Sequence, residues 1–120
     1  MTDFDALKPW LTEPDFEQWT HEGMKCEVRR NRLMGHLCGY VYLPDEHKLR
    51  GVSINELSSI DVHGGVTFFD GEKAGFDCAH AGDLQPYHPY GEGVGFDTYR
   101  SLEWVKAETN HMADQLAKVK

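Results

Sequence analysis

The chain has 120 residues, of which 40% are hydrophobic and 12% aromatic, so it can bury one modest core and is too apolar to be disordered. Its formal net charge of −8 argues against direct binding to a nucleic-acid backbone, because such binding needs a broad basic face. We expect a single domain over residues 1–120, and no run is long and apolar enough to predict a membrane span.

The cysteines indicate a reducing compartment. Cys26, Cys38 and Cys78 are odd in number, so they cannot form a complete disulfide framework, and no CxxC pair suggests a zinc ribbon. The N-terminal stretch MTDFDALKPW is acidic and lacks the basic start and apolar centre of a signal peptide. We therefore predict a cytoplasmic protein.

The first predicted element is a short helix within residues 12–23, TEPDFEQWTHEG. Thr12 can cap its first turn, and Gly23 suits its end. Phe16 and Trp19 lie three residues apart, as they would on one face of a helix.

A β-hairpin is predicted next, with its turn near residues 31–35. Residues 24–30, MKCEVRR, alternate apolar and charged side chains, and residues 35–43, GHLCGYVYL, also alternate between two faces. In the second strand, one face carries Leu37, Gly39, Val41 and Leu43, and the other carries His36, Cys38, Tyr40 and Tyr42.

The middle of the chain predicts a second strand pair. Residues 60–70, IDVHGGVTFFD, predict a strand that Gly64 and Gly65 interrupt, and residues 73–80, KAGFDCAH, predict its partner. Residues 81–96 are rich in glycine and proline and predict a long loop, which in a compact domain is often functional.

The last element is an amphipathic helix that Asp97 or Thr98 can cap. We therefore predict an α+β fold, a small antiparallel sheet with a short N-terminal helix and a C-terminal amphipathic helix. Apolar or small residues recur along that last helix at spacings of three and four, namely Leu102, Val105, Thr109, Met112 and Leu116.

Ionisable side chains crowd the central region. Residues 75–83, GFDCAHAGD, bring an acid, a thiol, an imidazole and a second acid close together, with glycine and alanine between them. Small neighbours leave space for a ligand to approach the backbone. If the predicted strands are neighbours, their polar faces gather around one hollow.

Three chemistries fit this region, and so does a purely structural role. Cys38, His63, Cys78 and His80 are zinc-type ligands, although their spacing matches no zinc signature. Cys78 beside His63 or His80 could be an activated nucleophile. Histidine, tyrosine and carboxylate side chains could instead recognise a polar small molecule, whereas the cysteines could simply be core residues.

The segments GHLCGYV, DVHGGVTF, GFDCAHAGD and YRSLEWVKAE resemble a family of short uncharacterised phage, prophage and bacterial proteins. Members of that family carry CGYV, VHGG[VLI]T and GFDxAHxGD motifs, and the resemblance covers roughly residues 24–119. This chain departs from the family in the short stretch FFDGEKA before GFD, where relatives carry a longer insertion. The resemblance implies a small accessory protein, located in the host cytoplasm if a phage encodes it.

Our leading hypothesis is a phage-type accessory protein that counters host defence by binding a small polar, nucleotide-like ligand, with no cofactor. An alternative is an acidic inhibitor that binds a host defence protein through Asp3, Asp5, Asp15 and Glu17; a third is a metal- or Cys78-dependent hydrolase. A homo-oligomer is possible in each case. The predicted ligand-binding residues are His36, Tyr40, His63, Thr67, Asp77, His80, Asp83 and Arg100.

Overall fold

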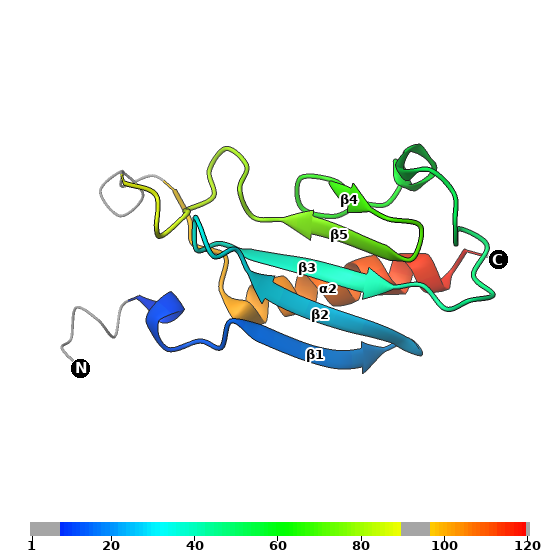
Figure 1. The fold of residues 1–120 in the computed structure, drawn as a ribbon, viewed down its shortest axis with the longest axis horizontal. Coiled ribbons are helices and arrows are strands. Elements are labelled where there is room, and N and C mark those ends of the chain that lie inside the picture. Colours follow the sequence, from blue (N-terminus) through cyan, green and yellow to red (C-terminus); the bar gives the residue numbers. More distant parts are fainter. Residues whose placement is uncertain (1–7, 90–96, 120) are drawn as a thin grey trace.

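The computed structural model describes residues 8–89 and 97–119. Within them, five strands form one antiparallel sheet in the order β1-β2-β3-β5-β4, and helix α2 packs along one of its faces (Figure 1). The predicted α+β class is therefore confirmed. The elements are η1 (Pro9–Leu11), β1 (Phe16–His21), β2 (Met24–Arg30), β3 (Leu37–Tyr42), η2 (Ile54–Leu57), β4 (Phe68–Phe69), β5 (Lys73–Asp77) and α2 (Leu102–Ala117).

The predicted hairpin forms the centre of the sheet. β2 and β3 pair antiparallel, with Cys26 opposite Val41 and Val28 opposite Gly39. The side chains of Cys26, Val28 and Val41 are fully buried against α2, which contacts both strands. The polar face of β3, with Cys38 and Tyr40, therefore lies on the side of the sheet that α2 does not cover.

The C-terminal helix is confirmed, but its cap is not the one expected. Ser101 is the N-cap, and its hydroxyl accepts a hydrogen bond from the Trp104 backbone N–H at 3.2 Å. Thr98 instead forms an isolated β-bridge with Asp83, which removes it from the helix start. The buried stripe of α2 consists of Val105, Thr109, Met112, Ala113 and Leu116.

The predicted helix over residues 12–23 is wrong, because Phe16–His21 is strand β1. A short helical turn does lie near the N-terminus, but it is η1. Tertiary contacts explain the difference, since alternate β1 residues reach α2 residues that are four apart. These contacts are Glu17 with Lys106 at 2.6 Å, Trp19 with Asn110 at 2.8 Å, and His21 with Asp114 at 2.7 Å.

The predicted strand over residues 60–70 is also mostly absent, because only Phe68–Phe69 pairs with β5. Gly64 and Gly65 both adopt positive φ, at 70° and 80°, which breaks an extended strand. The Gly65 N–H donates to the Val62 carbonyl at 2.8 Å and closes a turn there. The predicted partner strand is confirmed as β5.

A buried arginine joins the N-terminal segment to the rest of the fold. The Arg30 side chain is 2% exposed, and it donates to the Asp15 carboxylate, the Gly35 carbonyl and the Tyr99 hydroxyl at 2.8–2.9 Å. Its second amino group lies 3.5 Å from Glu13. Arg30 therefore joins three parts of the chain to β2: residues 13–15, the turn at Gly35 and the segment at Tyr99.

Within the described residues, no helix combines the length and the apolar character that crossing a bilayer requires.

Replacing Arg30 with alanine is expected to lower the free energy of unfolding by about 3–5 kcal/mol, since it leaves buried acceptors without a donor. Urea denaturation followed by circular dichroism measures this loss. Arg32→Ala is the control, because Arg32 is exposed and is expected to cost under about 0.5 kcal/mol. Equal losses in the two variants would show that the Arg30 contacts contribute little.

Candidate functional site

A cavity of about 460 Å³ lies on the sheet face that α2 leaves uncovered. This volume is within the range of small-molecule sites. The loop after β5 and the residues before β4 contribute walls from outside the sheet. The lining residues are Asn31, His36, Cys38, Tyr40, Thr67, Phe68, Phe76, Asp77, Ala79 and His80.

Five of the eight predicted ligand-binding residues line this cavity: His36, Tyr40, Thr67, Asp77 and His80. They come from the turn before β3, from β3 itself, from the segment before β4, and from β5 and the loop that follows it. The other three, His63, Asp83 and Arg100, do not line the cavity and form a separate network beside it.

The Asp77 carboxylate forms hydrogen bonds with two other residues that line the cavity. It accepts hydrogen bonds from the Thr67 hydroxyl at 2.9 Å and from the Ala79 backbone N–H at 3.1 Å. The His80 Nε2 atom lies 3.2 Å from the same carboxylate, but its alignment is too poor for a hydrogen bond. His80 thus keeps unused hydrogen-bonding capacity beside a carboxylate.

His36 is the most unusual polar residue of the cavity. It is only 6% exposed, and its Nδ1 atom has no hydrogen-bond partner among the described residues. Burial lowers the pKa of His36, and the nearby Asp77 and Asp83 carboxylates only partly oppose that effect. The imidazole is therefore neutral at pH 7, with one nitrogen able to donate and the other able to accept.

Asp83 is the centre of the neighbouring network. Its side chain is fully buried and accepts from His63 Nε2 at 2.7 Å, Arg100 Nε at 2.9 Å and the His80 backbone N–H at 3.0 Å. Burial alone would raise the pKa of Asp83, but these donors outweigh it and lower that pKa. Because its acceptors are occupied, Asp83 holds the loop in position and does not face a ligand.

Trp104 packs against the Asp83 network, and two histidine rings connect that network to the cavity. The Arg100 guanidinium lies 4.8 Å from the centre of the Trp104 ring, and the His63 ring lies 5.1 Å from it. The His63 and His80 rings are 5.7 Å apart. His63, Asp83 and Arg100 therefore support the cavity wall from behind, through His80.

The thiols are unsuited to nucleophilic catalysis as the structure places them. Cys78 is 1% exposed, and burial raises its pKa above that of a free thiol. Cys38 lines the cavity, but burial raises its pKa to about 11. Both thiols are protonated at neutral pH, whereas a reactive cysteine needs a lowered pKa.

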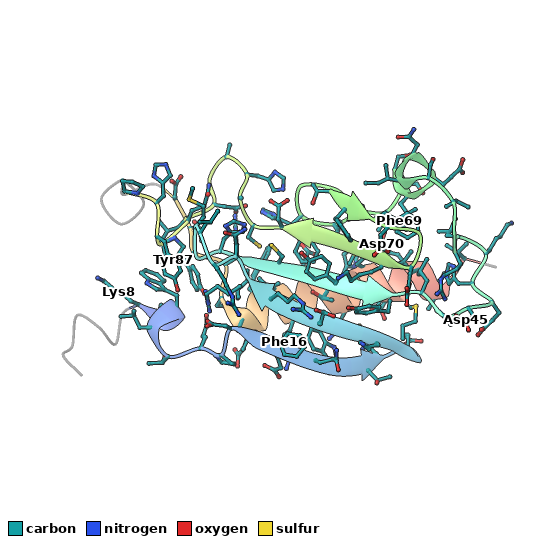
Figure 2. The ribbon with its side chains drawn as sticks, in the orientation of Figure 1. Lys8, Phe16, Asp45, Phe69, Asp70 and Tyr87 are labelled. Atoms are coloured by element: carbon teal, nitrogen blue, oxygen red, sulfur yellow. The ribbon has the colours of Figure 1, made fainter. Side chains whose placement is uncertain are left out.

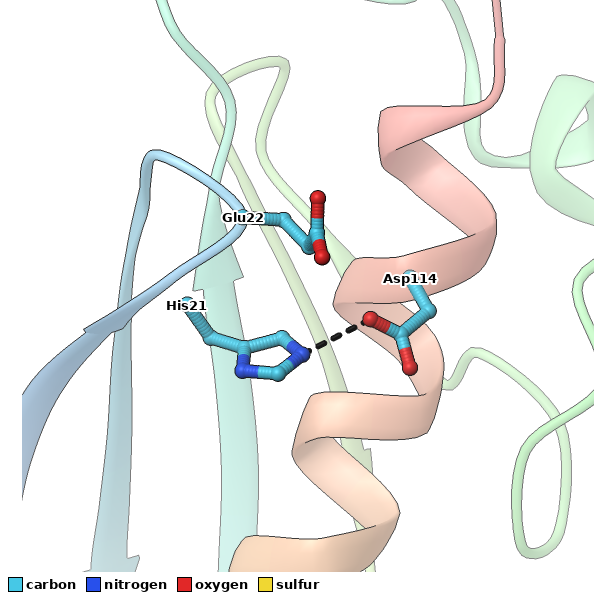
Figure 3. Close-up of side chains that lie close together, drawn as sticks. All are labelled: His21, Glu22 and Asp114. Carbon is cyan, nitrogen blue, oxygen red and sulfur yellow. Dashed lines mark hydrogen bonds and ion pairs between the residues drawn. The ribbon is translucent and has the colours of Figure 1, made fainter.

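The ligand atoms of the four zinc-type residues do not converge. Among the described residues, no three of Cys38, His63, Cys78 and His80 bring their ligand atoms within 4.8 Å of one another. The group that meets this condition is His21, Glu22 and Asp114, at the opposite end of β2 from His36 (Figure 3). There a hydrogen bond of 2.7 Å between His21 and Asp114 joins β1 to α2, which accounts for the arrangement without a metal.

Comparisons of the chain with protein-family models, with curated proteins and with solved structures found no match. The resemblance to short phage proteins stays a prediction from the sequence.

Sequence reasoning missed Asn31, Phe76 and Ala79 as lining residues. Asn31 belongs to the turn, where its side chain accepts hydrogen bonds from the backbone of Leu33 and Met34. Turn asparagines commonly do this, so nothing in the pattern marked Asn31 as a cavity residue. Phe76 belongs to the buried face of β5 and is 1% exposed.

Asp83→Asn tests the supporting network through pH. A lowered pKa in the folded state means that the carboxylate stabilises the fold above its ordinary pKa of 3.8, and that this contribution is lost as pH falls through the lower folded value. We expect a loss of about 1–3 kcal/mol at pH 7 in urea titrations. The difference in free energy of unfolding between wild type and variant should become smaller at pH values well below 3.8.

The control for this experiment is Asp61→Asn, because the Asp61 side chain is 91% exposed. That variant is expected to match the wild type at both pH values. If the stability lost in Asp83→Asn does not change with pH, that result would argue against an ionised, hydrogen-bonded Asp83.

Proposed function

We propose that this protein binds a small polar, nucleotide-like ligand in the cavity between β3, β5 and the segment before β4. The proposal rests on one observation above all: the Nδ1 atom of His36 is buried at the cavity without a hydrogen-bond partner. An unsatisfied buried polar atom costs about 1–3 kcal/mol, and a ligand that supplied the missing partner would remove that cost.

The composition of the cavity favours a planar, polar ligand. Its aromatic side holds Tyr40 and Phe68, whose rings are perpendicular at 6.0 Å between centres. Its polar side holds His36, Asp77 and His80. A nucleobase matches this division, because its faces stack on aromatic rings and its edge carries both donors and acceptors.

Binding without turnover is the simplest activity for this site. Both nearby thiols are protonated, and the zinc-type residues do not converge. A protein that only binds a nucleotide-like signal could counter host defence by sequestering it. The phage setting of this role comes from the sequence resemblance alone.

The structure gives less support to the alternative role as an acidic inhibitor than to ligand binding. Asp15 and Glu17, which were expected on the inhibitor surface, form ion pairs with Arg30 and Lys106 at 2.8 and 2.6 Å. Their charges are thus partly balanced within the chain. Asp3 and Asp5 lie outside the described residues.

Native mass spectrometry of the protein as purified tests the proposal directly. We expect a mass addition of a few hundred daltons that is lost on denaturation. The released molecule should absorb near 260 nm, as nucleobases do. The same spectrum reports whether the protein is a homo-oligomer. A bare mass, together with no rise in melting temperature in a panel of nucleoside mono- and triphosphates, would refute the proposal.

His36→Phe separates binding from stability. Removing the imidazole abolishes the recognition of the ligand edge, but it also removes the unpaired Nδ1 atom. We therefore expect the mass addition to disappear while the free energy of unfolding stays the same or rises by up to about 2 kcal/mol. His111→Phe is the matched control, since His111 is half-exposed and lies on α2 away from the cavity.

A further inference from the structure

A second surface adjoins the cavity on the same uncovered face of the sheet. It consists of Phe16 on β1, Lys25 and Arg29 on β2, Tyr42 on β3, and Lys73 on β5, which we call the cation–aromatic face. None of these five residues lines the cavity. Figure 2 shows Phe16 at its outer edge, on β1.

The strand register places these residues in two groups on one face of the sheet, with Glu27 of β2 between the groups. Phe16 is directly opposite Arg29 on the neighbouring strand, and Tyr42 is directly opposite Lys73. Lys25 is next to Cys26, which pairs with Val41, so Lys25 lies beside Tyr42. The five side chains therefore extend from one edge strand across the sheet towards β5.

Each cation of the face lies over an aromatic ring. The Arg29 guanidinium is 4.8 Å from the centre of the Phe16 ring, and the Lys25 ammonium is 4.3 Å from that of Tyr42. The Lys73 ammonium is 5.4 Å from the Tyr42 ring and 4.8 Å from the Tyr40 ring. Aromatic surface and positive charge thus alternate over the sheet.

The charge of this face is opposite to that of the whole chain. Three cations stand on it, although the chain carries a formal net charge of −8. Glu27 lies between them, but it is fully buried and paired with Arg29. Asp77 lies in the neighbouring cavity, and Asp70 caps backbone N–H groups in the turn between β4 and β5. Asp15, which precedes Phe16 in the chain, is paired with Arg30.

Phe16 is 46% exposed and is not part of the core. Its ring therefore offers apolar surface to solvent beside the Arg29 guanidinium. The Tyr42 ring is half-buried, and the Lys25 and Lys73 ammonium groups lie 4.3 and 5.4 Å from its centre. Flexible lysine side chains can move from a ring to a phosphate when a ligand arrives.

We propose that the cation–aromatic face binds a short single-stranded nucleic acid, with bases stacked on Phe16 and Tyr42 and phosphates held by Lys25, Arg29 and Lys73. Stacking rings beside cations on an open sheet suit unpaired bases joined by a charged backbone. A duplex hides the base faces and offers only its phosphates. The sequence argument against nucleic-acid binding rested on the net charge of the whole chain. Binding depends instead on the local distribution of charge over the surface.

Fluorescence anisotropy with a labelled oligothymidylate of about ten nucleotides tests this inference, since that length fits the usual site sizes. We expect saturable binding that weakens with salt, and much weaker binding of a duplex of the same length. Phe16→Ala should weaken binding at least about five-fold through lost stacking. Lys25→Glu should weaken it and reduce the slope of log affinity against log salt by about one or more.

Lys48→Glu is the matched control, because Lys48 is exposed on the loop after β3 and outside the face. It makes the same change in net charge as Lys25→Glu and should have a smaller effect. Equal losses in the two lysine variants, equal affinity for the duplex, or no anisotropy change in the wild type would each overturn the inference.

The inference does not depend on the ligand of the cavity. His36→Phe should leave oligothymidylate binding within about two-fold of wild type, since His36 is not on the face. If a mononucleotide binds but the oligonucleotide does not, the cavity proposal survives and the present inference fails. The reverse result would retain the face and reject the cavity.

Discussion

The buried guanidinium of Arg30 is the interaction on which the rest of this structure depends. It binds the carbonyl of Gly35, and so it fixes the turn that leads directly into His36 at the cavity. It also binds the hydroxyl of Tyr99, which donates to Glu13 at 2.6 Å. A buried charge with this many partners leaves few alternative arrangements, because each missing partner would be costly.

The same network sets where α2 begins. Besides its contacts with Arg30 and Tyr99, the Glu13 carboxylate accepts a hydrogen bond from the Leu102 backbone N–H at 2.8 Å. A carboxylate at this position also interacts favourably with the positive end of the helix dipole. The helix therefore starts at a point determined by a residue almost ninety positions away, together with the local cap Ser101.

The sequence was informative where local periodicity and burial agree. The alternation of Cys26, Val28 and Val41 predicted the central hairpin and its buried face, and the spacing of Val105 and Met112 predicted α2. Sharing of one strand face also placed His36, Cys38 and Tyr40 together at the cavity. Local patterns suffice for such elements because the spacing of their apolar residues already indicates the type of element and its buried face.

Long-range contacts account for what the sequence did not reveal. Phe16 and Trp19 have helical spacing, yet pairing with β2 and contacts with α2 place them on opposite faces of a strand. The GFDCAHAGD segment was predicted as one site, but the structure divides it: Asp77 and His80 line the cavity, whereas Asp83 turns inward to Arg100. A linear pattern cannot tell a ligand-facing carboxylate from one that internal donors already satisfy.

The three contacts between β1 and α2 have a geometric consequence. Two residues of a strand advance by about 6.7 Å and four residues of a helix by about 6 Å, so Glu17, Trp19 and His21 keep pace with the helix turns that carry Lys106, Asn110 and Asp114. The three pairs differ chemically: an acid with a base, an indole with an amide, and an imidazole with an acid. A shift of β1 by two residues would set Glu17 against Asn110 and Trp19 against Asp114. Because the three pairs differ chemically, only one alignment of β1 along α2 matches all of them. A uniform row of ion pairs would be compatible with several alignments.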